Sequence, residues 1–164
     1  MKRKRFWAAA GAFGLLAAVA SSALLQSQQA GQPVFSGGCY LTVIKDAEGN
    51  FASRSIITLH PDHTMLATDS GEQGPTNYFG SQLGTWRPAR NHQIVGRMID
   101  FCYPLNPGGL GVARADYVIS LAPGRRQVTG TITVRAFPLP DGNPLEDEGI
   151  LIGTFTFEGE SIKP

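Results

Sequence analysis

From residue 38 to the end of the chain, apolar and polar residues alternate in short runs with a period of two. The runs are rich in β-branched and aromatic residues and are separated by Gly, Pro, Asn and Asp, which is typical of antiparallel strands joined by turns. No stretch in this region has the apolar spacing of a long amphipathic helix. The pattern predicts about eight strands, at residues 39–45, 53–60, 64–69, 79–87, 93–103, 112–121, 127–137 and 151–161.

Turns join these strands in sequence order. The links at residues 46–50, 60–63 and 122–125 contain Pro, which presets φ, or Gly and Asn, which accept the left-handed region. Eight sequential antiparallel strands favour a closed sheet, because closure removes both exposed edges. We therefore expect residues 38–164 to form one all-β domain, which is a single antiparallel up-and-down barrel of about eight strands.

The strands differ in how clearly they indicate an inner face. In 127–137, Val128, Ile132 and Val134 alternate with a row of threonines, so the apolar row is expected to face the interior. The strands at 93–103 and 112–121 are apolar on both faces, which indicates that part of the outer wall is also covered. The cover would be a loop, the N-terminal segment or the partner chain of a homodimer.

The N-terminus has the pattern of an export signal. A basic head at residues 1–5 precedes an uncharged run to residue 25, and Ala18-Val19-Ala20 offers a peptidase site. We expect a signal peptide at 1–20, cleaved after residue 20 or 23, and then a flexible linker at 21–37. The alternative is an uncleaved membrane anchor, because the run has about the 20 residues that cross a bilayer. In either case the barrel is predicted to be secreted or periplasmic.

Charge and motifs exclude several classes of function. The chain has 14 Lys and Arg against 13 Asp and Glu, and loss of the four bases at residues 2–5 leaves 10 against 13, a net charge of −3. This balance argues against binding to nucleic acids or anionic membranes, so a membrane would be met only through an uncleaved N-terminal segment. His60, His63 and His92 are expected to be ordinary turn residues and not metal ligands, and no motif predicts a cofactor.

The two cysteines, Cys39 and Cys102, lie far apart in a chain predicted to enter an oxidising compartment. One interpretation is a disulfide between them, which would stabilise the fold by roughly 3–4 kcal/mol in the chain-entropy picture. The other is a pair of small buried thiols.

Charged residues within the strands are candidates for a binding site. Arg97, Arg114 and Asp116, together with Asp100 and Arg135, must be paired if they face inward. They would then orient a ligand carboxylate or carbonyl. The alternative is an ion-pair network that closes the barrel or lies on its outside.

Two aromatic residues join these candidates. Trp86 and Tyr117 would line the barrel and contact a ligand, or else fill the core.

Several segments resemble the lipocalin-like, or calycin-type, barrels, and in particular secreted proteins of that shape. The likeness is carried by residues 57–65 with their Pro-Asp turn, by Asp69-Ser70 and by Gly84-Thr85-Trp86-Arg87, and continues in residues 111–115 and 128–132. The resemblance implies a barrel with an interior site for a small molecule. Lipocalins carry Gly-x-Trp on the first strand, whereas Gly38-Cys39-Tyr40 stands there in this chain, so the match is to the barrel and not to that motif.

Three functions remain open. The leading hypothesis is an exported noncatalytic barrel that binds a small hydrophobic or amphipathic ligand, since eight strands enclose enough room for one. The alternatives are a cyclase- or isomerase-type enzyme that uses the same cavity, and a protein-interaction module whose barrel is filled.

Overall fold

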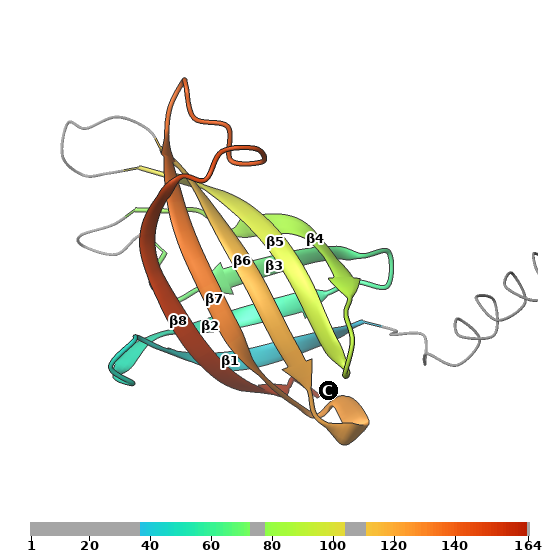
Figure 1. The fold of residues 1–164 in the computed structure, drawn as a ribbon. Helices are drawn as coiled ribbons and strands as arrows, with labels where there is room; N and C mark the ends of the chain where they lie inside the picture. Colours follow the sequence, from blue (N-terminus) through green and yellow to red (C-terminus); the bar gives the residue numbers. More distant parts are fainter. Residues whose placement is uncertain (1–36, 73–77, 104–110, 164) are drawn as a thin grey trace, which may run out of the picture. The chain divides into compact units, whose positions relative to one another are not determined.

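Eight antiparallel strands pair in sequence order and close into a barrel where β1 meets β8 (Figure 1). The computed structural model describes residues 37–72, 78–103 and 111–163. A 3₁₀ turn, η1 (Pro123–Arg125), precedes β7. The strands are β1 (Gly38–Lys45), β2 (Phe51–Leu59), β3 (Thr64–Asp69), β4 (Gln82–Pro88), β5 (Gln93–Cys102), β6 (Gly111–Leu121), β7 (Gln127–Pro138) and β8 (Ile150–Ser161).

The predicted all-β up-and-down barrel is confirmed. The fourth strand begins at Gln82 and not at residue 79, because Phe79 makes only an isolated bridge to Cys102. The predicted signal peptide at residues 1–20, and the predicted linker apart from Gly37, lie outside the described residues.

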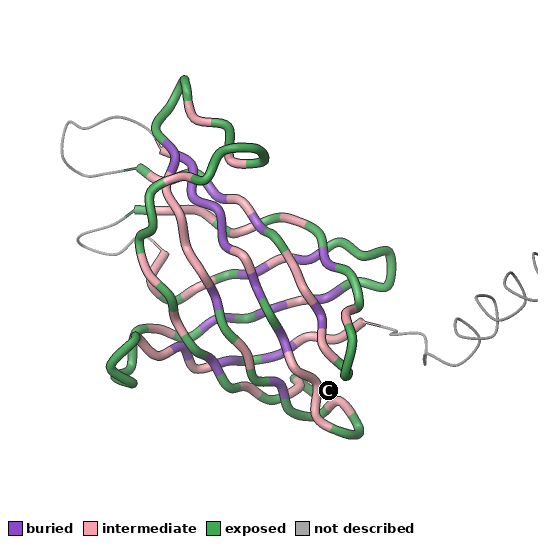
Figure 2. Tube along the Cα trace, viewed as in Figure 1, coloured by how far each residue is buried: buried purple, intermediate pink, exposed green. Residues whose placement is uncertain are grey.

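Buried positions recur along the strands, as the period-two pattern requires (Figure 2). In β7, Val128 and Ile132 are buried, in agreement with the predicted inner face. In β5, the sequence left both faces open, and the structure buries Ile94, Met98 and Asp100. The inward row of this strand is therefore apolar at one end of the barrel and polar at the other.

The two ends of the barrel differ. The connections β2–β3, β4–β5 and β6–β7 lie at what we call the closed end, and the connections β1–β2 and β7–β8 lie at what we call the open end (Figure 1). Large apolar side chains are buried in the closed half: Tyr40, Leu59, Met65, Trp86, Ile94 and Ile119. Trp86 also donates a hydrogen bond from Nε1 to the His60 carbonyl, at 3.0 Å, which ties the core to the β2–β3 turn. This close packing leaves any interior space to the open half.

Candidate functional site

A cavity of about 530 Å³ occupies the open half of the barrel. One side of it is apolar and is built by β1, β7 and β8, whose lining residues include Ile44, Ile132, Val134, Ile150, Ile152 and Phe155. Ile150 and Ile152 are 66% and 61% exposed, although they line the cavity. Apolar side chains that stay in contact with water inside a concave site are a surface that a ligand can cover.

The opposite side is polar and belongs to β2 to β6. Its polar side chains are Ser53, Ser55, Asp69, Gln82, Asp100, Cys102 and Tyr117. They reach the cavity because they fall on the inward positions of their strands. Asp100, for example, follows Met98 by two residues, and Asp69 follows Ala67 by two.

A chain of hydrogen bonds connects three neighbouring strands in this polar wall. The Tyr117 hydroxyl donates to Gln82 Oε1 at 2.6 Å, and Gln82 Nε2 donates to Asp100 Oδ2 at 3.0 Å. The Cys102 thiol donates to the other oxygen, Asp100 Oδ1, at 3.3 Å. The chain fixes the amide orientation of Gln82 and places both Asp100 oxygens as acceptors.

Asp69 is held separately in the same wall. Its Oδ2 accepts from the Ser53 hydroxyl at 2.9 Å, and its Oδ1 accepts from the backbone N–H of Gly71 at 2.7 Å. Glu72 lies close by, with Oε1 accepting from the Asp69 backbone N–H at 3.0 Å. Asp69 and Asp100 thus lie on the same side of the cavity, and Glu72 lies beside Asp69 but outside the lining.

Burial changes the acidity of these groups. Burial raises the pKa of the Asp69 and Asp100 carboxyls above the ordinary value of 3.8, against the opposing effect of their hydrogen bonds. Burial and the charge of Asp100 raise the pKa of the Cys102 thiol to about 12, so it remains protonated at neutral pH. The pKa of Tyr117 is also raised, by burial first and then by the charges of Asp69 and Asp100. The phenol is a hydrogen-bond donor at neutral pH.

Two of the predicted site residues lie inside the barrel. Tyr117 lines the cavity. Trp86 lies in the core of the closed half, where its ring contacts that of His63 in a tilted arrangement with centroids 4.6 Å apart. The two aromatic candidates therefore lie in different halves of the barrel, because the β2–β3 turn that binds Trp86 is at the opposite end from the cavity.

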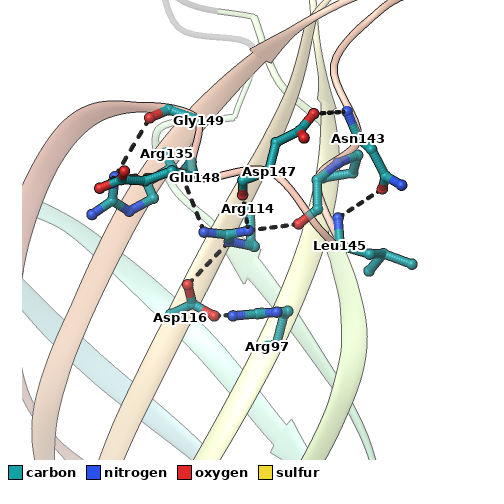
Figure 3. A network of polar contacts seen from close by, with 10 residues as sticks. Arg97, Arg114, Asp116, Arg135, Asn143, Leu145, Asp147, Glu148 and Gly149 are labelled. Carbon is teal, nitrogen blue, oxygen red and sulfur yellow. Dashed lines mark hydrogen bonds and ion pairs between the residues drawn. The ribbon is translucent and has the colours of Figure 1, made fainter.

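The three charged candidates form a network on the outer face (Figure 3). Asp116 accepts from Arg97 Nε at 2.6 Å and from Arg114 Nε at 3.1 Å. These residues do not line the cavity, because they occupy the outward positions that alternate with inward residues such as Tyr117. Of the two interpretations for charged strand residues, the arrangement matches the ion-pair network outside the barrel.

Arg114 is nevertheless only 6% exposed, because the connection between β7 and β8 covers it. Its guanidinium donates to the carbonyls of Pro144, Asp147 and Glu148 at 2.7, 2.9 and 3.3 Å (Figure 3). It also lies 5.0 Å from the centre of the Phe137 ring. The sequence analysis allowed a loop, the N-terminal segment or a partner chain as the cover of the outer wall, and over Arg114 the cover is a loop.

The two cysteines are not bonded to each other. Cys39 begins β1 at the closed end, with Sγ 3.5 Å from Thr58 Oγ1, whereas Cys102 ends β5 at the open end and bonds Asp100. The predicted disulfide is absent from the structure, because the topology puts the two thiols at opposite ends of the barrel.

Comparison with family models, with curated proteins and with solved structures gave no match. The site is thus described by its own geometry. Within residues 37–72, 78–103 and 111–163, no group of three or more His, Cys, Asp or Glu side chains could hold a metal ion. The same residues include no helix long and apolar enough to span a membrane.

Sequence reasoning missed most of the polar wall. Asp69 and Gln82 were not recognised as site residues, and Asp100 was named only among the charged strand residues. A signal was present: Asp100 has the same parity in its strand as Ile94 and Met98. A polar residue in an otherwise apolar inward row is the sign of a lined cavity.

Proposed function

We propose that the protein is an exported, noncatalytic barrel that binds one small amphipathic molecule in its open half. The observation that carries the proposal is the cavity of about 530 Å³ with an apolar side and a polar side. This volume lies within the roughly 300–1,000 Å³ range of small-molecule sites. A filled barrel, as a pure interaction module would have, offers no such space.

The division of the lining supports an amphipathic ligand in particular. The apolar part of the molecule would cover Phe155 and the exposed side chains of Ile150 and Ile152. Covering apolar surface contributes roughly 25 cal/mol per Å². The polar part would contact the hydrogen-bonded groups of β3 to β6, where Tyr117, Gln82 and Asp100 already hold fixed positions.

Export is supported by the N-terminal sequence, which combines a basic head, an apolar run and a small-residue cleavage site. The likeness to lipocalin-like barrels is consistent with a carrier or receptor of small molecules outside the cytoplasm. The eight-stranded closed barrel is the part of that likeness on which the proposal depends.

The proposal is tested by titrating the mature protein with N-phenyl-1-naphthylamine, a dye that is uncharged at neutral pH and fluoresces in apolar surroundings. We expect saturable binding of one dye per barrel, reduced at least tenfold by Ala136→Phe, which places a ring in the cavity. The matched control is Leu151→Phe, because Leu151 is exposed and does not line the cavity. Absence of saturable binding to the folded wild-type protein would refute the proposal, and so would equal binding by both variants.

One observation favours a second candidate, an isomerase- or cyclase-type enzyme. Asp100 faces the cavity, and burial raises the pKa of its carboxyl above 3.8, as is common for a carboxyl that acts as a general acid or base. The two are separated by incubating the molecule recovered from the cavity with fresh protein and comparing its NMR spectrum before and after, because isomers have the same mass. A carrier releases its ligand unchanged, whereas an enzyme would release a rearranged isomer that Asp100→Asn no longer forms.

A further inference from the structure

The charges that line the cavity are all of one sign. Asp69 and Asp100 both face it, and the described lining residues include no Lys, Arg or His. Asp100 is connected through Gln82 to the Tyr117 hydroxyl, and Asp69 lines the same polar wall from β3. The cavity therefore has an acidic centre at one side.

Several basic residues of the surrounding strands pair with other groups outside the cavity lining. Arg97 and Arg114 are bound to Asp116 on the outer face, and Arg135 donates to the Glu148 carbonyl at 3.3 Å. Lys45 pairs with Glu158 at 2.7 Å. A ligand carboxylate would thus meet two acids in the cavity, and no lining cation of the described residues would balance it.

Each of the two carboxylates retains capacity to accept further hydrogen bonds. Among the residues that the structure describes, each oxygen of Asp69 and Asp100 accepts one hydrogen bond, from Ser53, Gly71, Gln82 or Cys102. A carboxylate has about four acceptor positions on its two oxygens. All four donors are neutral, so the burial of these charges is offset only in part.

Resting on the function proposed above, we infer that the ligand carries a positively charged nitrogen, such as a primary ammonium, that contacts Asp69 and Asp100. The apolar part of the molecule then lies against β7 and β8. An ammonium offers three donors and no acceptor, which matches a wall whose free capacity is to accept. Charge-assisted hydrogen bonds are also stronger than neutral ones, so the cation gains more here than an alcohol.

The test compares three molecules with the same apolar chain: octylamine, 1-octanol and octanoate. Each competes with N-phenyl-1-naphthylamine for the wild-type barrel at pH 7. We expect octylamine to displace the dye at a concentration at least tenfold below that of octanoate, with 1-octanol between them. A tenfold ratio corresponds to about 1.4 kcal/mol at 25 °C.

Variants locate the source of the preference. Asp69→Asn combined with Asp100→Asn is expected to reduce the preference for octylamine over 1-octanol by about tenfold, while the affinity for 1-octanol changes little. The control is Glu160→Gln, which removes an acid from an exposed position outside the cavity lining and should leave the ranking unchanged. Dye binding by the double variant reports that it has folded, and if it does not fold, the wild-type ranking decides alone.

The outcomes separate the two proposals. Equal displacement by the three molecules, or tightest binding of octanoate, would overturn the inference of a cationic ligand but leave the cavity as a binding site. An unchanged preference in the folded double variant would overturn it as well. If the dye does not bind the wild-type barrel at all, the proposed function fails and the inference fails with it.

Discussion

The closed half of the barrel is filled by its own side chains, whereas the open half keeps a cavity of about 530 Å³. Both halves are made by the same eight strands with the same period-two alternation. They differ in what occupies the inward positions: large apolar residues such as Trp86 and Met65 in one, and smaller or polar residues such as Ala136 and Asp100 in the other. The comparison indicates that close packing in one half stabilises the fold, while the other half keeps the interior space on which the proposed function depends.

The largest difference is expected from truncating the same residue type in each half. Ile57 is 1% exposed and Ile152 is 61% exposed. Ile57→Ala should lower the free energy of unfolding by about 2–5 kcal/mol, because it leaves a cavity in close packing. Ile152→Ala should lower it by less than about 1 kcal/mol but weaken dye binding. Urea denaturation measures both, and equal losses would contradict the division into halves.

Alanine enlargement tests the same division from the opposite direction. Ala67 is buried in the close-packed part of β3, whereas Ala136 lines the cavity. Ala67→Phe should cost about 1–3 kcal/mol or more, since a dense core cannot accept the ring. Ala136→Phe should change the free energy of unfolding by less than about 1 kcal/mol, because the ring enters empty space. A large loss in Ala136→Phe would show that the cavity is absent in solution.

The outer loop gives an effect of intermediate size. Arg114→Met removes three hydrogen bonds to carbonyls between Pro144 and Glu148, together with the ion pair to Asp116, and should lower the free energy of unfolding by about 1–3 kcal/mol. Arg135→Met is the matched control, because the bonds of Arg135 to this loop are longer, at 3.3 and 3.5 Å, and the effect should be smaller. Limited proteolysis of residues 139–149 should accelerate in Arg114→Met alone. Neither Arg114 nor Arg135 lines the cavity, so dye affinity should be nearly unchanged in both.

The smallest expected effect is a dependence of stability on pH. The folded-state pKa values of Asp69 and Asp100 are raised above 3.8. The two carboxyls therefore contribute stability that is fully present below pH 3.8 and is lost as pH rises through their folded-state pKa values. Asp62 has a lowered pKa and acts in the opposite direction, but it is unchanged in the variant and cancels in a comparison.

The measurement is urea denaturation of the ligand-free wild type and of Asp69→Asn with Asp100→Asn, at several values between about pH 4 and pH 7. The stability of the wild type should fall relative to the variant as pH rises. Glu72, Tyr117 and Cys102 share this environment and are present in both proteins. If the stability of the wild type instead rises relative to the variant as pH rises, the fold stabilises the two carboxylates in their charged form. That result would contradict the account, in which the polar wall offsets their negative charge only in part.

The sequence predicted the barrel well because its strands and turns are locally encoded. In β7, Val128, Ile132 and Val134 indicate the inner face by alternation alone. The candidate site was harder to predict, because β5 and β6 are apolar on both faces. Their orientation depends on the loop that covers Arg114, which lies about 30 residues further along the chain.

The central claim is that the open half holds a small molecule, and native mass spectrometry of the mature protein purified from its natural source tests it most directly. The account predicts one adduct per barrel that is released under gentle activation and is absent from Ala136→Phe prepared in the same way. Its mass should belong to a small amphipathic molecule that contains a basic nitrogen. A folded wild-type barrel without an adduct, or an adduct that Ala136→Phe retains in full, would contradict the claim.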